Sequence, residues 1–209
     1  MEPQWIRWAK RIQALAQTGL TYATDPYDQE RYRELRQIAV DMLATQCGLT
    51  SESERVRLEE LFAGETGYPT PKVDVRSVVF DGDRVLLVKE RSDGRWSLPG
   101  GWADVGSSPA EMAAREVAEE TGYVVRPVRL LAVWDNSRHH NRPVAYAVYK
   151  ICIACELTGG QPRASIETEA VGWFAVDELP PLSVTRITAE QIRRLYRLYR
   201  DPSLPPEFD

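Results

Sequence analysis

Hydrophobic positions in the first 63 residues recur at spacings of three and four, which is the period of an amphipathic α-helix. Three successive helices are predicted. The first ends at Gly19, the second runs from Pro26, behind the N-cap Asp25, to Gly48, and the third begins with a capping box at Ser51. The apolar stripe of the first helix consists of Trp5, Trp8, Ile12 and Leu15. We therefore expect a small all-helical domain at this end of the chain.

A linker rich in glycine and proline (residues 64–71) separates this domain from a region in which strands dominate. The Asp81-Gly82-Asp83 segment between two strands is a hairpin signal. Strands with helices between them predict an α+β layered domain, and we expect domains at residues 1–66 and 67–209. The expected strands are Val73–Phe80, Arg84–Glu90, Val124–Trp134, Val144–Leu157 and Val171–Val176, and the expected helices are Pro109–Thr121 and Ala189–Arg200.

Composition narrows the functional classes. The net charge of −5 argues against a general nucleic-acid binder, because phosphate backbones are held by excess Lys and Arg. No segment is long and apolar enough to span a membrane, and the first ten residues lack the pattern of a signal peptide. Cys152 and Cys155 lie in an expected strand and therefore point to opposite faces, so we interpret them as core thiols of a cytoplasmic protein.

Three acids gather at the end of the expected helix Pro109–Thr121. Glu116, Glu119 and Glu120 fall within one third of the helix circumference, away from its apolar side. A solvated charged face is the alternative. However, the like charges repel one another, and the helix dipole disfavours anions just before Gly122. A divalent cation would relieve both penalties, and hard carboxylate oxygens suit Mg²⁺ or Mn²⁺.

The preceding segment prepares the start of this helix. The pair Gly100-Gly101 permits close backbone approach and unusual dihedral angles. Ser108, Pro109 and Glu111 form a second capping box with proline at the first helical position. A tight turn is therefore expected to lead into a well-started helix whose far end holds the acids.

The segment from Gly101 to Tyr123 resembles the Nudix box, G-x₅-E-x₇-R-E-U-x-E-E-x-G-U, where U is a bulky aliphatic residue. The resemblance implies a Nudix α/β/α sandwich with a mixed sheet. It also implies that the three glutamates bind divalent metal, that the Gly101 carbonyl is a further ligand, and that Arg115 orients the carboxylates. The residues at matching positions are Gly101, Arg115, Glu116, Val117, Glu119, Glu120 and Gly122.

Two positions depart from this pattern. Tyr123 replaces the last aliphatic residue, and Ser107 stands where the first glutamate is expected. Asp104 or Glu111 could compensate for the missing carboxylate at Ser107. The number of metal ions therefore stays open, as does a degenerate domain that binds without hydrolysing.

The first domain resembles the helical domain that precedes certain Nudix domains. The segments that carry this resemblance are Ala14–Tyr22, Asp25–Asp28 and Arg31-Tyr32. Enzymes of this kind act on nucleoside diphosphates linked to a group X, such as CDP-choline pyrophosphatase. The resemblance covers nearly the whole chain and implies a homodimer formed through the N-terminal helices, with CDP-alcohols or ADP-ribose as substrates. The sequence leaves the base and the X group open.

The expected reaction is attack of water on one phosphorus of a P–O–P bridge, with a carboxylate accepting the proton. Glu119 is a box acid for this role, and Glu169, in a polar loop before a strand, is a candidate outside the box. Related enzymes often bring a glutamate from this loop toward the metals, but an exposed loop acid is an equally good interpretation.

Several polar side chains could contact the substrate. Arg76 and Arg91 flank the first hairpin, and His139 and His140 lie in a polar loop after a strand. Each could also be an ordinary surface residue. Two further functions remain in competition with hydrolysis of a nucleoside diphosphate-X. One is a non-catalytic nucleotide sensor, which the excess of acids over bases in the first 63 residues disfavours, and the other is RNA end processing.

Overall fold

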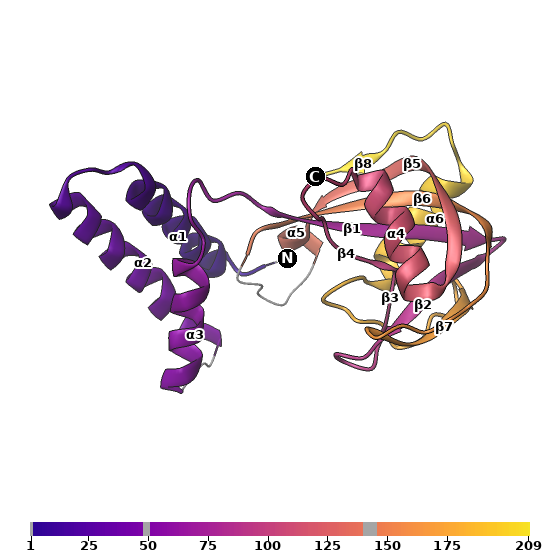
Figure 1. Cartoon of the computed structure of the whole chain (residues 1–209), viewed down its shortest axis with the longest axis horizontal. Coiled ribbons are helices and arrows are strands. Elements are labelled where there is room, and N and C mark those ends of the chain that lie inside the picture. Colours follow the sequence, from indigo (N-terminus) through magenta and orange to yellow (C-terminus); the bar gives the residue numbers. More distant parts are fainter. Residues whose placement is uncertain (1, 48–50, 140–145) are drawn as a thin grey trace. The chain divides into compact units, whose positions relative to one another are not determined.

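The structure, a computed structural model, describes residues 2–47, 51–139 and 146–209 (Figure 1). Its contacts divide the chain into two compact units. The first comprises Met1–Pro71 with Ser137–Ala147, and the second comprises Lys72–Asn136 with Val148–Asp209. The sequence-based boundary between residues 66 and 67 stays a prediction. None of the helices in the described ranges is both long and apolar enough to cross a membrane.

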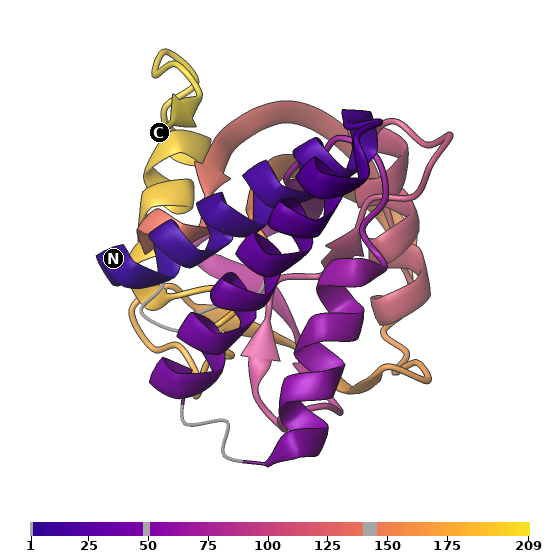
Figure 2. The ribbon, with the colours of Figure 1, turned by 90° about the vertical axis from the view of Figure 1, so that its left-hand side faces the viewer.

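The N-terminal part of the first unit contains the helices α1 (Gln4–Tyr22), α2 (Pro26–Cys47) and α3 (Glu52–Ala63), as predicted (Figure 2). The capping box of α3 is present, with the Ser51 side chain accepting from the Glu54 N–H. Their shared core is built from a small set of apolar side chains. These are Ile6, Ala9, Val40, Leu43 and Phe62.

The predicted end of α1 at Gly19 is wrong, because the helix continues to Tyr22. A Cβ atom placed on Gly19 would lie 2.3 Å from the ring of Tyr32, which belongs to α2. The glycine is therefore required by close helix packing and not by a helix stop. Trp8 and Leu15 also lie outside the core, because the buried face of α1 is the one that carries Ile6.

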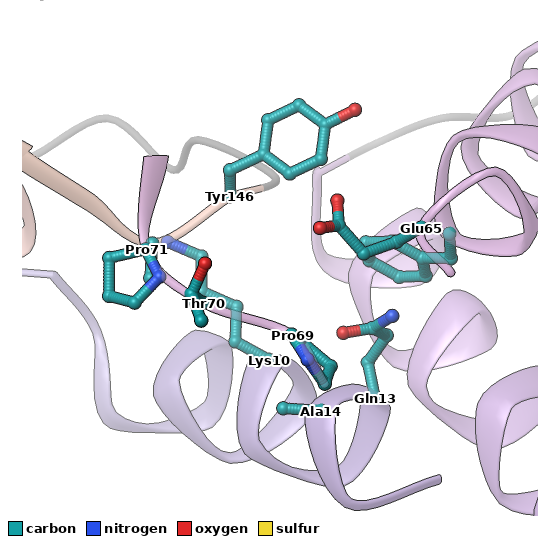
Figure 3. A pocket seen from close by; sticks show the side chains of 10 residues that line it. Lys10, Gln13, Ala14, Glu65, Pro69, Thr70, Pro71 and Tyr146 are labelled. Carbon is teal, nitrogen blue, oxygen red and sulfur yellow. The ribbon is translucent and has the colours of Figure 1, made fainter. Parts of the chain in front are cut away.

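A small cavity of about 100 Å³ lies within the first unit, near the loop that follows α3 (Figure 3). Lys10 lines it and is bound to the carboxylate of Glu2 at 2.6 Å. Tyr146, Gln13 and Glu65 also line it. Its volume is far below the 300–1,000 Å³ typical of small-molecule sites, so we do not assign it a nucleotide.

The second unit is built on a mixed sheet in which β3, β2, β1, β6, β5 and β8 follow one another, while β4 pairs with β1 and β7 pairs with β2. The β1/β6 and β5/β8 pairs are parallel and the others are antiparallel. The strands are β1 (Lys72–Asp81), β2 (Arg84–Glu90), β3 (Trp96–Ser97), β4 (Gly100–Trp102), β5 (Tyr123–Asp135), β6 (Val148–Gly160), β7 (Thr168–Ala175) and β8 (Glu207–Phe208).

Helices α4 (Pro109–Thr121) and α6 (Ala189–Arg200) pack against different apolar clusters of this sheet, while the short α5 (Asn136–His139) follows β5 (Figure 1). Met112, Ala113 and Val117 of α4 pack with Cys155, whereas the apolar side of α6 packs with Cys152. The two cysteines thus point to opposite faces, as expected, and burial raises the pKa of each thiol to about 12. The predicted α+β fold with helices on both faces of a mixed sheet is confirmed.

The predicted caps of α4 are present. Ser108 and Glu111 form the capping box, and Gly122 ends the helix with a φ of 75°. The short strands β3, β4 and β8 and the short helix α5 were not expected from the sequence. Two- and three-residue strands carry too few residues for an alternation of apolar and polar side chains to be visible.

Gly100 connects the sheet to the acids of α4. Its φ of 138° is accessible to glycine, and a Cβ atom at this position would lie 2.0 Å from the carbonyl oxygen of Val75 in β1. The close approach of β4 to β1 therefore depends on this residue.

We expect Gly100→Ala to lower the free energy of unfolding by more than about 3 kcal/mol, because the new methyl group meets backbone that cannot move aside. Gly82→Ala is the matched control. Gly82 has a φ of 63°, but a Cβ atom there would have no neighbouring atom within 4 Å. Gly82→Ala should therefore lower the free energy of unfolding only by the backbone strain that it introduces, about 1–2 kcal/mol. Urea denaturation would measure both, and equal costs for the two variants would contradict the assignment.

Candidate active site

The three acids of α4 line one cavity of about 900 Å³, together with residues from a loop between β6 and β7. This volume lies within the range of small-molecule binding sites. The acids differ in their surroundings. Glu119 is exposed, Glu116 is half-buried and Glu120 is only 6% exposed. The expectation that all three point away from the packed surface is therefore wrong for Glu120, which lies where the end of α4 meets β4.

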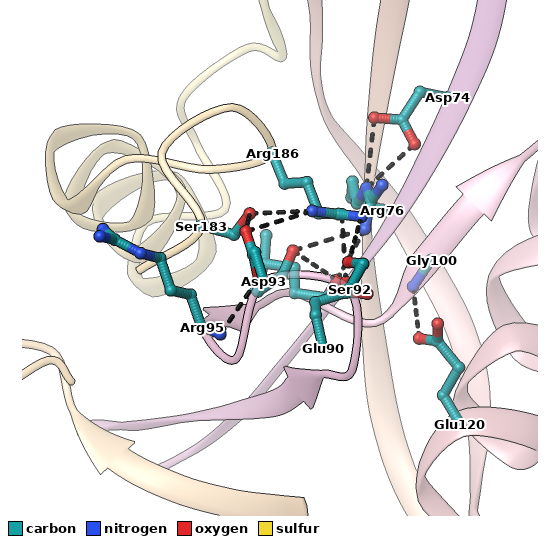
Figure 4. Close-up of polar contacts among 12 residues, drawn as sticks. Asp74, Arg76, Glu90, Ser92, Asp93, Arg95, Gly100, Glu120, Ser183 and Arg186 are labelled. Carbon is teal, nitrogen blue, oxygen red and sulfur yellow. Dashed lines mark hydrogen bonds and ion pairs between the residues drawn. The ribbon is translucent and has the colours of Figure 1, made fainter. Parts of the chain in front are cut away.

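The carboxylate of Glu120 accepts a hydrogen bond of 2.9 Å from the N–H of Gly100 (Figure 4). Burial raises the pKa of Glu120 to about 8, although this hydrogen bond and the positive charge of Arg76 oppose the shift. A buried carboxylate with a single donor is incompletely compensated. Its environment is therefore one in which an added cation would stabilise the charged form.

Glu116 is close to the second glycine of the pair. A Cβ atom on Gly101 would lie 3.5 Å from Oε1 of Glu116, so the backbone of β4 lies directly against this carboxylate. Burial and the neighbouring charge of Glu119 raise the pKa of Glu116. The structure thus brings Gly101, Glu116 and Glu120 together, as the sequence predicts.

Three carboxylates and a glycine-rich strand lie at the same end of α4. Their oxygen atoms are the donors that a hard divalent cation prefers. Within residues 2–47, 51–139 and 146–209, however, no three acidic, His or Cys side chains converge closely enough to form a ready-made metal site. One carboxylate oxygen of Glu120 accepts the hydrogen bond from Gly100. The donor chemistry of the three acids fits a divalent metal.

Arg115 forms an ion pair with Asp104, and its second terminal nitrogen lies 3.5 Å from the hydroxyl of Ser107. The carboxylate missing at position 107 is thus replaced, as a partner for Arg115, by Asp104. Glu111 does not take this role because it is bound to Ser108 in the capping box. Arg115 lies next to Glu116 in sequence, but in the described part of the chain it forms no hydrogen bond to Glu116, Glu119 or Glu120.

Arg76 is buried and does not face solvent as a free phosphate ligand. Its Nε lies 3.0 Å from Asp74, and its Nη1 donates to the carbonyl of Leu98 at 3.1 Å (Figure 4). Lys150 is also buried, donates to the Arg186 carbonyl, and lies 3.9 Å from Asp74. Burial lowers the pKa of Lys150 to about 8. These groups support the backbone that leads to Gly100, so the position of Arg76 favours a supporting role over direct substrate contact.

A second polar cluster joins the end of β2 to the loop before α6 (Figure 4). Arg186 lies 3.3 Å from Glu90 and 3.5 Å from Asp93, and Ser183 donates to Asp93 at 2.7 Å. This cluster anchors the residues that precede Trp96 and β3. This cluster could not be predicted from the sequence, because its members lie about 90 residues apart.

The loop acid near the cavity is Glu167 and not Glu169. Glu167 lines the cavity, whereas Glu169 lies at the start of β7 and forms an ion pair of 2.8 Å with Lys89. The hydrogen bond from Lys89 lowers the pKa of Glu169. A carboxylate held by a lysine outside the cavity is poorly placed to accept a proton from attacking water. The sequence predicted the polar loop, but not which of its two glutamates lines the cavity.

Arg91 lines the cavity, and its side chain donates to the carbonyl of Ser165 at 3.3 Å, while its contact with a substrate stays a prediction. Arg163 and Ile166 also line the cavity and were missed by the sequence analysis. His139 ends α5 and belongs to the first unit, so its role stays a prediction. His140 lies outside the described residues.

Comparison with known proteins identifies the class. The family model for the NUDIX domain matches residues 70–196, and a model described as a UDP-X-like, N-terminal oligomerisation domain matches residues 3–62. The chain belongs to the Nudix hydrolase family. The resemblance predicted from the box and from the N-terminal helices is thereby confirmed.

Individual relatives are similar over most or all of the chain. A Bacillus subtilis protein named, provisionally, an ADP-ribose pyrophosphatase is 44% identical over 100% of this chain and 99% of its own length. The crystal structure of a UDP-X diphosphatase is 35% identical over 98% of both chains, with a TM-score of 0.64. The crystal structure of an ADP-ribose pyrophosphatase from Streptococcus suis is 41% identical over 67% of this chain and 100% of that one, with a TM-score of 0.62.

Proposed function

We propose that the protein hydrolyses the diphosphate bridge of a nucleoside diphosphate linked to a group X, with Mg²⁺ or Mn²⁺ bound by the acids of α4. The observation that carries the proposal is the cavity of about 900 Å³ in which Glu116, Glu119 and Glu120 meet two arginines. Relatives named for ADP-ribose and for UDP-X support this substrate class. ADP-ribose, UDP-sugars and CDP-choline are the compounds to compare.

The chain's own groups divide the work. Glu116, Glu119 and Glu120, with the carbonyl of Gly101, would hold the metal, while Gly100 donates to one oxygen of Glu120. When bound, the divalent ion supplies positive charge at the diphosphate and a more acidic water. Glu167 replaces Glu169 as the proposed acceptor of the proton from the attacking water, and Glu119 remains the alternative within the box.

We expect Glu116→Gln and Glu120→Gln each to lower kcat/KM by more than about 100-fold, because a neutral amide binds a divalent cation weakly and adds no negative charge. Glu111→Gln is the matched control on the same helix, since glutamine retains the capping box and Glu111 does not line the cavity. Phosphate released from nucleoside diphosphate-X compounds through a coupled phosphatase measures the reaction. If the Glu116 and Glu120 variants turn over substrate as fast as the control, the metal assignment fails.

The assignment of the proton acceptor gives a separate prediction. Glu167→Gln should lower kcat by about 10²–10⁴-fold with little change in metal affinity, because general-base catalysis contributes a factor of this size. Glu169→Gln removes an equal charge two residues away and should leave kcat within about threefold, since Glu169 lies on Lys89. Steady-state kinetics with both variants, and titration calorimetry with Mn²⁺, would check this. The reverse order of effects would restore Glu169 as the base.

We also propose that the protein is a homodimer formed through α1. Trp8, Leu15 and Tyr22 are spaced seven residues apart and are 53%, 60% and 68% exposed, so α1 carries a second apolar stripe outside its own core. Apolar residues at heptad spacing are typical of helix-to-helix association. The match to a family model described as an oligomerisation domain supports this proposal.

Leu15→Lys should convert the dimer into a monomer, because burying a leucine contributes about 1.5–3 kcal/mol and a buried lysine is unfavourable. Val128→Lys, on β5 and 40% exposed, is the control for adding a surface charge at an exposed apolar site. Size-exclusion chromatography with light scattering would report the mass. A wild-type protein that is monomeric at micromolar concentration, or a Leu15→Lys variant that remains dimeric, would exclude this interface.

A further inference from the structure

The loop between β6 and β7, residues 161–167, forms the wall of the acid-lined cavity that faces the end of α4, and it is fixed to that helix by its backbone. The N–H of Gln161 donates to the carbonyl of Gly122, and the N–H of Arg163 donates to the carbonyl of Thr121 at 2.8 Å. The buried hydroxyl of Thr168 donates to the carbonyl of Glu120 at 2.9 Å. Carbonyl groups that a helix end leaves without partners are thus satisfied by the loop and by the first residue of β7.

Gly122 permits this close attachment. A Cβ atom there would lie 2.5 Å from the carbonyl oxygen of Gln161 and 3.0 Å from Cβ of Arg163. The backbone of Arg163 is therefore held in a defined position against the C-terminal end of the helix that carries the acids. Its side chain lines the cavity together with Glu116, Glu119 and Glu120.

The guanidinium of Arg163 differs from those of its neighbours. Arg91 donates to the loop carbonyl of Ser165, and Arg115 is paired with Asp104. Arg163 is exposed, and among the described residues its side chain has no hydrogen bond or ion pair. A cation that the protein leaves available at a substrate-sized cavity is suited to bind an anion brought by the ligand.

We propose that Arg163 is a substrate-binding residue whose guanidinium contacts the diphosphate of the substrate from the loop side of the cavity, facing the acids. This inference rests on the proposed function. The acids need a positively charged partner before an anion can approach them, whereas Arg163 offers its charge to the anion directly. The substrate's diphosphate is then held between the end of α4 and the loop, and the fixed backbone at residue 163 determines where that contact is made.

The test compares Arg163→Gln, Arg163→Lys and the control Arg193→Gln. Arg193 is exposed on α6 and does not line the cavity, so its replacement changes the net charge equally. For a compound that the enzyme hydrolyses, we expect Arg163→Gln to raise KM by about tenfold with kcat within about threefold, because a charge-assisted hydrogen bond to the bound substrate is lost. Arg163→Lys should recover part of the loss, and Arg193→Gln should leave KM unchanged.

Binding is measured separately, by titration calorimetry with a methylene-bridged nucleoside diphosphate sugar that cannot be hydrolysed, in the presence of Mg²⁺. A Kd raised about tenfold by Arg163→Gln supports the contact, provided that Arg193→Gln leaves Kd unchanged and that Arg163→Gln does not alter the thermal stability. Unchanged KM and Kd for Arg163→Gln, or equal effects of Arg193→Gln, overturn it. If the parent protein hydrolyses no nucleoside diphosphate-X, the proposed function fails, while the calorimetric comparison still decides the role of Arg163.

Discussion

The hydrogen bond between the N–H of Gly100 and the carboxylate of Glu120 is the contact on which the arrangement of the site depends. It joins β4 to the last turn of α4 across 20 residues of sequence and places a carboxyl group in a largely buried position. Ionising this group is costly without full compensation, and the raised pKa of Glu120 expresses that cost. The fold retains it because the same contact keeps the acids next to the glycine-rich strand.

Buried groups of β1 and of the segment before β4 fix the position of Gly100 in this contact. Gly100 can approach Val75 because it has no side chain, and buried Arg76 binds both Asp74 and the carbonyl of Leu98, two residues before Gly100. Buried polar groups of this kind are tolerated when their hydrogen bonds are satisfied. The network therefore fixes the path of the backbone from β3 to β4, and through it the position of Glu120.

Sequence predicted what is local. The caps of α4, the glycine at its end and the spacing of the three glutamates are encoded within about 20 residues, and the resemblance to the Nudix box lies in the same segment. Periodicity also separated the three N-terminal helices from the strands. The end of α1 was misplaced because a glycine that allows helix packing and a glycine that ends a helix have the same appearance in a sequence.

What sequence could not predict depends on contacts between distant segments. Lys89, which lies on a neighbouring strand, binds Glu169, whereas Glu167 lines the cavity. The burial of Arg76 follows from the return of the chain at Leu98. Asp104 takes the place of the acid missing at Ser107 as the ion-pair partner of Arg115. This too depends on the fold of the loop, because Asp104 and Ser107 lie within reach of Arg115 only once the turn is formed. Arg163 carried no signal because an isolated arginine in a polar loop is ordinary.

The attachment of the 161–167 loop to α4 connects these observations to function. A helix that ends in three acids would normally expose its last carbonyls to water and leave the acids on an open surface. Here the loop satisfies the carbonyls of Thr121 and Gly122, and the hydroxyl of Thr168, at the start of β7, satisfies that of Glu120, so the loop lies directly beside the carboxylates. These hydrogen bonds complete the helix end and build the second wall of the cavity. The position of Gly122 in the box is explained by both tasks, because its positive φ ends the helix and its missing side chain admits the loop.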